Sequence, residues 1–237
     1  GRDRAGNEVV EHARLVVGAD GRNSFVARQV EAPKYNERPI RAIAYFAYYS
    51  GWESTAMETY SRDGDAAYAF PTNWGLACLG GYWPASKLDE VRADPEAAIA
   101  SVFASIPQFA DRFPRARRIE RIQGSTGTAA YYRKSVGPGW ALVGDAAYLK
   151  DPILAAGIAD AFRDADYTAD AILDGYASGG NVEEHLAKHE ERRARQTAAA
   201  YAMNDLVASG GLTQEGLLGI QAAVRSAAEA RSAAKAA

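Results

Sequence analysis

Two short stretches of the chain place a glycine and an aspartate directly after an apolar run. In "LVVGADG" the carboxylate is that of Asp20, and in "WALVGDAA" it is that of Asp145. Glycine at the end of a strand lets a ligand approach the backbone, and a carboxylate there can accept hydrogen bonds from hydroxyl groups such as those of a sugar or ribityl chain. A single Gly-Asp pair is more often a turn or a helix cap. The repetition favours a binding site for a polar cofactor.

The second stretch continues into small residues that precede a predicted helix. Pro152 interrupts the chain, and residues 155–158 (Ala-Ala-Gly-Ile) follow it. Unbonded amides at a helix N-terminus, together with the helix dipole, favour a negatively charged group. We expect a side chain at Gly157 to intrude on a ligand, and the backbone there to need a conformation that only glycine adopts easily.

The N-terminal half of the chain reads as a short strand–helix pair followed by several strands. Residues 15–17 predict a buried strand, and residues 24–30 predict a short helix with Ser24 as its N-cap rather than as a nucleophile. Residues 40–83 are rich in aromatic side chains and turn signals, which is typical of an antiparallel meander. The segment "SRDGDA" within it predicts a hairpin turn.

Helices dominate the C-terminal half. A helix is predicted from Pro95 to residue 106, with Asp94 as its N-cap, and "GWALVGD" predicts a buried strand. Longer helices are predicted over 158–176 and 181–208, and the alanine-rich tail is also helix-prone.

Composition excludes several classes of protein. The 237 residues are 48% hydrophobic and 24% charged, with a formal net charge of −3, so nucleic acid is not an expected partner. We see no apolar run of the roughly 20 residues that a membrane span needs, and no signal peptide, so a cytoplasmic location is expected. The lone cysteine, Cys78, lies in an apolar run and predicts an inert buried thiol.

The two glycine–aspartate stretches resemble motifs of a known family. "GADGRNSFVAR" is similar to the Asp-Gly motif, and "GWALVGDAAYLKDPILAAGIADAFRDA" to the Gly-Asp motif, of the FAD-dependent aromatic hydroxylases, the para-hydroxybenzoate hydroxylase-like flavoprotein monooxygenases. Flavin halogenases and geranylgeranyl reductases are relatives of that group. The resemblance implies a mixed α/β fold, in which a partial Rossmann-like FAD-binding domain carries an inserted antiparallel substrate domain and C-terminal helices.

The resemblance also implies roles for individual residues. Asp145 would bond the ribityl hydroxyls of FAD, and Asp20 would lie near the pyrophosphate. Pro152 and the backbone from Ala155 to Ile158 would wrap the pyrimidine edge of the isoalloxazine. Arg28 stands where the family often has an arginine, although a surface helix explains it nearly as well. The implied cofactor-binding set is Asp20, Gly21, Arg28, Gly144, Asp145, Pro152, Ala155, Ala156, Gly157 and Ile158.

Two departures from the family pattern limit the resemblance. The Gly-x-Gly-x-x-Gly fingerprint is absent from these residues, so we expect an N-terminally truncated chain that lacks the ADP-binding half of the site. Tyr148 stands where many hydroxylases have histidine. The implied domains are an FAD-binding part (1–35 and 117–176), a substrate domain (36–116) and C-terminal helices (177–237).

These patterns lead to an expected function. We expect an FAD-dependent oxidoreductase, with NAD(P)H as the reductant, that hydroxylates or epoxidises an apolar or aromatic small molecule. A flavin halogenase or reductase is the alternative, as is a catalytically silent fragment. No catalytic residue can be named. No metal site is expected, because a solvated helix face accounts for His185 and His189.

Overall fold

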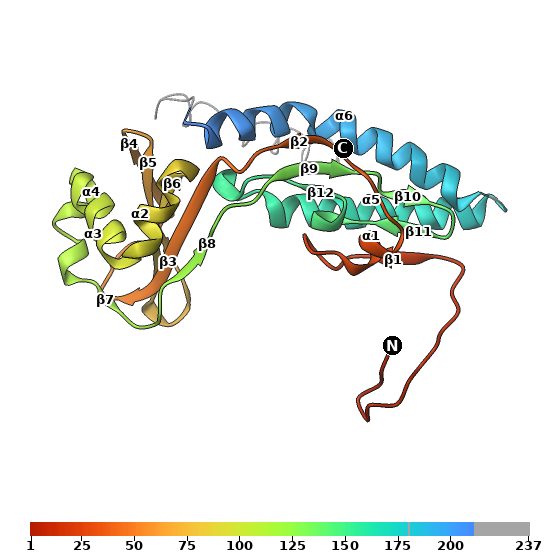
Figure 1. Ribbon diagram of the computed structural model, residues 1–237, viewed down its shortest axis with the longest axis horizontal. Coiled ribbons are helices and arrows are strands. Elements are labelled where there is room, and N and C mark those ends of the chain that lie inside the picture. The colour runs from red at the N-terminus through yellow and green to blue at the C-terminus, as the bar shows by residue number, and fades with distance from the viewer. Residues whose placement is uncertain (180, 211–237) are drawn as a thin grey trace. The chain divides into compact units, whose positions relative to one another are not determined.

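The computed structural model describes residues 1–179 and 181–210, and the chain folds as two units (Figure 1). The first unit comprises Gly1–Glu37 and Ala130–Ala199. The second comprises Arg38–Ala129 and, of the described C-terminal residues, 200–210. The predicted alanine-rich helix lies outside the described residues.

The first unit contains two three-stranded sheets and the two long helices. Strand β1 is parallel to β11, with Val16 opposite Trp140 and Gly18 opposite Leu142, and β10 pairs with the other side of β11. The second sheet has the order β12-β9-β2. The elements are β1 (Val16–Gly18), α1 (Phe25–Gln29), β2 (Lys34–Arg38), β9 (Ala130–Arg133), β10 (Val136–Gly137), β11 (Trp140–Leu142), β12 (Tyr148–Leu149), α5 (Gly157–Ala177) and α6 (Val182–Ala208), the last of which continues into the second unit.

The second unit is an antiparallel sheet covered by helices. Strands β4, β5 and β6 form consecutive hairpins, and β3 pairs with β6, so the order is β4-β5-β6-β3-β7, with β8 also on β3. Alternate side chains of β3 pack against α3 in a core with several aromatic rings. The elements are β3 (Ala42–Ser50), β4 (Glu58–Arg62), β5 (Asp65–Pro71), β6 (Ala77–Pro84), α2 (Leu88–Ala93), α3 (Pro95–Ser105), α4 (Pro107–Ala110), β7 (Arg117–Arg118) and β8 (Gln123–Ser125).

Local sequence signals are confirmed in the second unit. Asp63 and Gly64 form the β4–β5 hairpin turn with positive φ angles of 53° and 85°. Asp94 caps α3 by accepting a hydrogen bond from the Ala97 amide at 3.0 Å. Cys78 is partly buried, and this burial raises the pKa of its thiol to about 11, as expected for an inert cysteine.

The predicted domain boundaries need correction. Residues 117–129 were expected in the FAD-binding part, but β7 and β8 pair with β3 of the second unit. The chain from 177 to 199 packs with the first unit instead of forming a separate helical part. In both places long-range packing decides the boundary.

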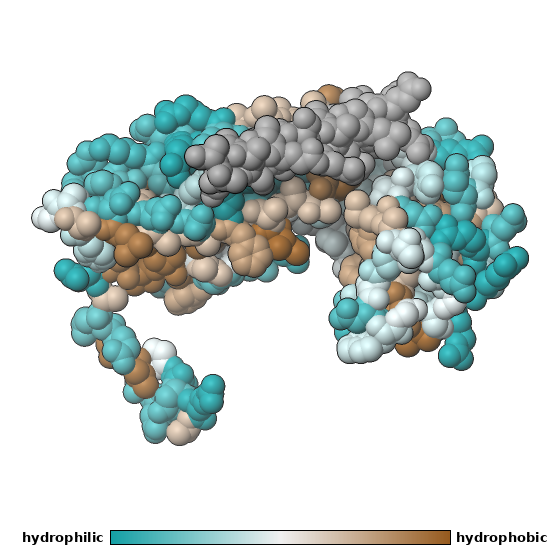
Figure 2. Space-filling model, turned by 180° about the vertical axis from the view of Figure 1, so that it is seen from behind, coloured by the Kyte–Doolittle hydropathy of each residue, from teal (hydrophilic) through white to brown (hydrophobic). Residues whose placement is uncertain are grey.

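The burial of β1 differs from expectation, and α5 buries a polar residue. Val16 and Val17 remain 47% and 41% exposed, so β1 is not the buried strand that its composition predicts. On α5 the apolar side chains of Ile158 and Phe162 are 76% and 75% exposed, while Asp164 is buried. Figure 2 shows hydrophobic surface gathered on the first unit. The first half of helix α5 therefore buries the polar Asp164 and exposes apolar side chains, whereas Ala171 in its second half packs in a hydrophobic cluster.

Candidate cofactor site

The two predicted turns lie side by side. Because β1 and β11 are parallel neighbours, the turns that follow them leave the same edge of the sheet. The Val143 amide donates to the Gly18 carbonyl at 3.0 Å, which extends the pairing to the turns. The buried Tyr131 hydroxyl lies 3.1 Å from the Arg22 carbonyl and 3.4 Å from the Asp145 carbonyl. Sequence reasoning did not single out Tyr131, which links the two turns.

Asp145 lies in a tight turn whose apolar neighbours are buried. Gly144 has a φ of +61°, and the chain then makes a single 3-10 turn over Gly144–Ala146. The flanking Leu142 and Ala146 are buried, and they anchor the turn to the core. Only a residue without a Cβ adopts this left-handed conformation cheaply, so Gly144 is needed for the shape of the turn.

The carboxylate of Asp145 has no partner among the described residues. The residue is exposed, and among residues 1–179 and 181–210 its side chain makes no hydrogen bond or ion pair. Desolvation and the neighbouring Asp160 raise the pKa of Asp145, against the opposing charges of Arg22 and Lys150. A hydrogen-bond donor on a ligand would therefore stabilise the ionised form of this carboxylate.

The loop before α5 leaves a helix N-terminus without a side-chain cap. Asp151 caps a short 3-10 turn, Pro152–Leu154, with its Oδ1 3.0 Å from the Ile153 amide. Ala156 then occupies the N-cap of α5 and has no side-chain acceptor for the first amides of the helix.

Gly157 opens α5, and a Cβ added there would meet nothing within 4 Å. The expectation that Gly157 needs a glycine-only conformation is wrong, because the left-handed residue of this loop is Ala155, with a φ of 50°.

Asp20 differs from Asp145 because its carboxylate is engaged. One oxygen accepts hydrogen bonds from the amides of Phe25, at 2.6 Å, and Val26, at 3.1 Å. Ser24 caps the same helix through the Ala27 amide at 2.9 Å, as predicted. Desolvation alone would raise the pKa of Asp20, but the hydrogen bonds from Ser24 and these amides outweigh it and lower the pKa.

The remaining predicted residues lie beside these turns. Gly21 has a φ of +74° and open space where a Cβ would be, so it completes the turn after Asp20. Arg28 is exposed on α1, and its guanidinium donates to the Asn23 carbonyl. The predicted residues thus form two groups, one around the start of α1 and the other between β11 and α5.

Sequence reasoning missed the side chains that hold the Gly144 turn. The Gly144 amide donates to the carboxylate of Asp164 on α5 at 2.8 Å. His189 and Arg193 of α6 bond the same carboxylate. His189 is 6% exposed, so the expectation of a solvated face was wrong for this residue. A pair of polar residues four apart on α6 was the available signal, and it could not reveal which face was buried.

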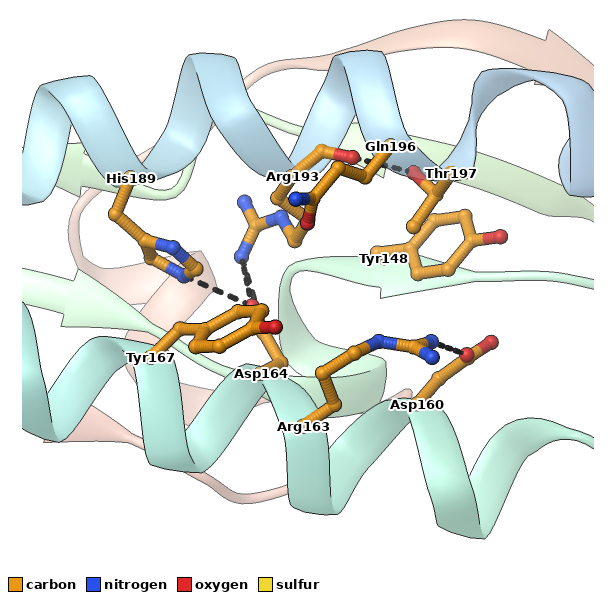
Figure 3. Close-up of a pocket in the computed structure, with 9 residues that line it drawn as sticks. All are labelled: Tyr148, Asp160, Arg163, Asp164, Tyr167, His189, Arg193, Gln196 and Thr197. Atoms are coloured by element: carbon orange, nitrogen blue, oxygen red, sulfur yellow. Dashed lines mark hydrogen bonds and ion pairs between the residues drawn. The ribbon is translucent and has the colours of Figure 1, made fainter. Parts of the chain in front are cut away.

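A small cavity lies between α5, α6 and β12 (Figure 3). Its volume is about 20 Å³, which accommodates a water molecule but not a cofactor. Polar and aromatic side chains line it: Tyr148, Asp160, Arg163, Asp164, Tyr167, His189, Arg193, Gln196 and Thr197.

The described part of the chain offers neither a metal-binding cluster nor a membrane-spanning helix. Within residues 1–179 and 181–210 there is no cluster of three or more histidine, cysteine or acidic side chains that could hold a metal ion. Over the same residues, no helix combines the length and the apolar character that crossing a bilayer requires.

Similar proteins share this fold. No family model matches the chain. A 1H-pyrrole-2-carbonyl-[peptidyl-carrier protein] brominase of Pseudoalteromonas luteoviolacea is 29% identical over 68% of this chain and 42% of the relative. A digeranylgeranylglycerophospholipid reductase of Methanothrix thermoacetophila is 26% identical over 80% of this chain and 48% of the relative. The structure of PqsL, a probable FAD-dependent monooxygenase of Pseudomonas aeruginosa, superposes with a TM-score of 0.68 at 21% identity, over 92% of this chain and 61% of that one.

The chain has the fold of the flavoprotein monooxygenase and halogenase superfamily. It spans less than half the length of the two curated relatives. The mixed α/β fold with antiparallel sheets is thereby confirmed. The similarity extends to halogenases and a reductase as well as to a monooxygenase, so it supports the superfamily rather than the para-hydroxybenzoate hydroxylase-like group in particular.

Proposed function

We propose that this chain carries the flavin side of an FAD-dependent oxidoreductase, a monooxygenase of the para-hydroxybenzoate hydroxylase-like type. One observation carries the proposal. Two turns leave adjacent parallel strands at the same edge of the sheet, and the carboxylate of Asp145 in one of them has no bonding partner among the described residues. Ligands of open α/β sheets bind beyond the carboxyl ends of the strands, where these turns lie.

The residues present fit FAD in charge and in space. The unengaged carboxylate of Asp145 suits the ribityl hydroxyls, whose donors would relieve its desolvation. The uncapped N-terminus of α5 suits the electron-rich edge of the ring, and the open space at Gly157 leaves room for it. Arg28 and the turn at Gly21 would face the pyrophosphate. When bound, FAD supplies the redox chemistry, and these residues bind and orient it.

The substrate proposal rests on the second unit. Its sheet buries one face against α3 and keeps half-buried aromatic rings on the other. On that second face the rings of Tyr68 and Phe70 stack with centroids 4.9 Å apart, and Phe46 meets Tyr48 edge to face. Such a surface favours an apolar or aromatic small molecule over a polar one. NAD(P)H is proposed as the reductant, as the family resemblance implies.

Two other flavin chemistries remain in competition with the proposal. The 29% identity to a brominase favours a halogenase, although the Trp-x-Trp-x-Ile-Pro stretch of halogenases is absent from these residues. The similarity to a lipid reductase favours a reductase. Product analysis under controlled conditions separates the three. All of them need reduced flavin, but a monooxygenase also needs oxygen and no halide, a halogenase needs both oxygen and halide, and a reductase works without oxygen.

The test of the flavin proposal is FAD binding by the complete protein. Asp145→Ala removes charge-assisted hydrogen bonds, so we expect the dissociation constant for FAD to rise roughly 10- to 100-fold. Fluorescence quenching of FAD titrated with apoprotein measures it. Asp145→Asn keeps one acceptor and should weaken binding less.

Two results would count against the proposal. Equal affinity of wild type and Asp145→Ala would show that Asp145 is only a turn residue. A complete wild-type protein that binds no FAD would favour the catalytically silent alternative.

A further inference from the structure

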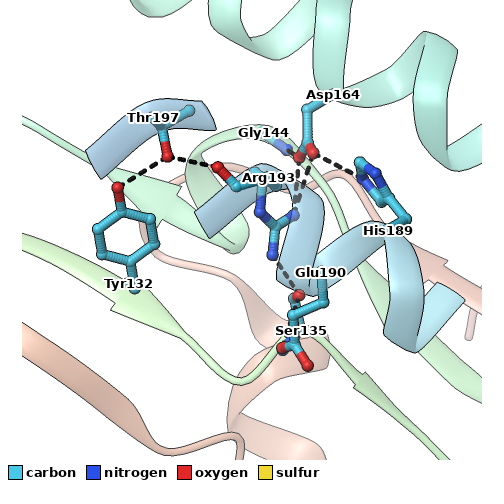
Figure 4. A network of polar contacts seen from close by, with 8 residues as sticks. All are labelled: Tyr132, Ser135, Gly144, Asp164, His189, Glu190, Arg193 and Thr197. Carbon is cyan, nitrogen blue, oxygen red and sulfur yellow. Dashed lines mark hydrogen bonds and ion pairs between the residues drawn. The ribbon is translucent and has the colours of Figure 1, made fainter. Parts of the chain in front are cut away.

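Asp164 is a buried carboxylate that the family resemblance did not assign to any role. Its side chain lies on the inward face of α5 and is 6% exposed. Oδ2 accepts the Gly144 amide at 2.8 Å, and Oδ1 accepts Nε2 of His189 at 3.0 Å. Nη1 of Arg193 lies 3.1 Å from both oxygens. Figure 4 shows these donors converging on one carboxylate from the turn and from α6.

The donors keep this carboxylate ionised despite its burial. Desolvation alone would raise the pKa of Asp164, but the hydrogen bond from His189, the charge of Arg193 and the Gly144 amide together lower it. An ionised acceptor forms a stronger hydrogen bond with the Gly144 amide than a neutral one does. The turn is therefore held by a charge that depends on α6 for its stability.

Helix α6 is itself braced against the strands. Nη2 of Arg193 donates to the Ser135 hydroxyl, and both the amide and the hydroxyl of Ser135 donate to Glu190 of α6, at 2.6 and 3.0 Å. Lys134 adds an ion pair with Glu190 at 2.5 Å. These contacts fix the position of Arg193 along the helix, and through it the position of Asp164.

We propose that Asp164 is a positioning residue of the cofactor site, and that His189 and Arg193 of α6 hold it in place. By fixing the Gly144 amide, Asp164 sets the direction of the next residue, Asp145. We call the hydrogen bond from the Gly144 amide to Asp164, with the bonds of His189 and Arg193 to the same carboxylate, the clamp. The effect of the clamp on the cofactor rests on the proposed FAD function, whereas the clamp itself does not. Helix α6, which contributes none of the predicted cofactor contacts, thereby takes part in shaping the site.

The clamp can be measured without cofactor, by NMR of the Gly144 amide in the complete protein. Labelling with ¹³C-carbonyl valine and ¹⁵N-glycine selects the Val-Gly pairs, which in this chain end at Gly18, Gly137 and Gly144. In Asp164→Asn we expect the Gly144 amide proton to move upfield and its hydrogen exchange to become roughly tenfold faster or more. Gly137, on the adjoining strand β10, reports whether the fold survives.

A second pair of variants covers the case in which Asp164→Asn does not fold. His189→Gln retains an N–H donor toward Asp164, whereas His189→Leu has none. Faster exchange of Gly144 in His189→Leu, with wild-type behaviour in His189→Gln, supports the clamp. Glu184→Gln, which breaks an exposed ion pair with Lys188 on the same helix, is the matched control and should change neither signal. An unchanged Gly144 signal in both Asp164→Asn and His189→Leu would overturn the proposal.

FAD titration then separates the clamp from the flavin proposal. If Asp164→Asn loosens Gly144 and also weakens FAD binding at least tenfold, while Glu184→Gln does neither, the positioning role is supported. If Gly144 loosens but FAD affinity stays at the wild-type value, Asp164 does not position the cofactor site. If wild type itself binds no FAD, the flavin proposal fails, and the NMR result still decides whether the clamp exists.

Discussion

The turns around Asp20 and Asp145 begin alike and end differently. Each follows a parallel strand of the same sheet and contains a glycine with positive φ. After Asp20 a helix begins within reach, so its amides take up the carboxylate. After Asp145 the next long helix begins only at Gly157, and the carboxylate remains unengaged among the described residues. The carboxylate of Asp20 thus caps a helix of its own fold, whereas a ligand role for Asp145 is what we propose.

The difference also reverses the direction of the two pKa shifts. Hydrogen bonds from the helix outweigh desolvation and lower the pKa of Asp20, whereas desolvation and Asp160 raise the pKa of Asp145. At the second turn, the amide that needs an acceptor is that of Gly144, and Asp164 supplies the acceptor from α5. The local amides are thus satisfied by the turn's own aspartate at the first turn and by a residue of α5 at the second.

The largest effect on stability should come from the two glycines. Gly144→Ala and Gly21→Ala each force a left-handed conformation on a residue with a Cβ, and each should lower the free energy of unfolding by about 1–2 kcal/mol. Neither Cβ meets an atom closer than the 3.4 Å between Gly144 and Ala161, so backbone strain dominates both. Urea unfolding of the complete protein measures the loss. A cost at one glycine alone would show that the turns are not conformational equivalents.

Replacing the two aspartates should change the free energy of unfolding by less, and by different amounts at the two turns. Asp20→Ala removes the acceptor of two amides of α1, and it should cost about 1 kcal/mol, as should Ser24→Ala at the same helix. Asp145→Ala removes no such acceptor and should leave stability almost unchanged. Urea unfolding of these variants and of wild type tests this, with the midpoints compared at one common dependence of the unfolding free energy on urea concentration. Equal losses for Asp20→Ala and Asp145→Ala would remove the distinction between the turns.

The smallest expected effect is on the pH dependence of stability. The ionisation of the two aspartates should change the free energy of unfolding in opposite directions. Because the folded-state pKa of Asp145 is raised, its ionisation costs stability as the pH rises from the ordinary value of 3.8 through the folded-state pKa. Asp145→Asn should therefore increase the free energy of unfolding at pH 7, by no more than about 0.5 kcal/mol.

Asp20 should behave in the opposite way. Its folded-state pKa is lowered, so its contribution is present above 3.8 and is lost as the pH falls through the folded-state pKa. Asp20→Asn should lower stability at pH 7. Thermal melts from pH 3 to 7 measure both variants. A loss of stability in Asp145→Asn at pH 7 would mean that its carboxylate has a partner in the fold.

Much of the fold follows from signals confined to a few neighbouring residues. The caps at Ser24 and Asp94, the hairpin at Asp63–Gly64 and both long helices occur where the sequence predicts them. Each depends on contacts within one turn of helix or one hairpin, so the residues nearby determine it. The glycine–aspartate turns belong to this class, and the sequence was sufficient to find them.

The tertiary structure alone decided which surfaces meet. On α5 the apolar residues Ile158 and Phe162 are exposed and Asp164 is buried, which hydrophobic patterning would have assigned the other way round. Patterning distinguishes two faces of a helix but does not identify what packs against either. The bond between Asp164 and His189 and the pairing of β8 with β3 join residues far apart in the chain. Because such contacts form only when both partners are already placed, no local spacing in the sequence could reveal that α6 holds the Gly144 turn.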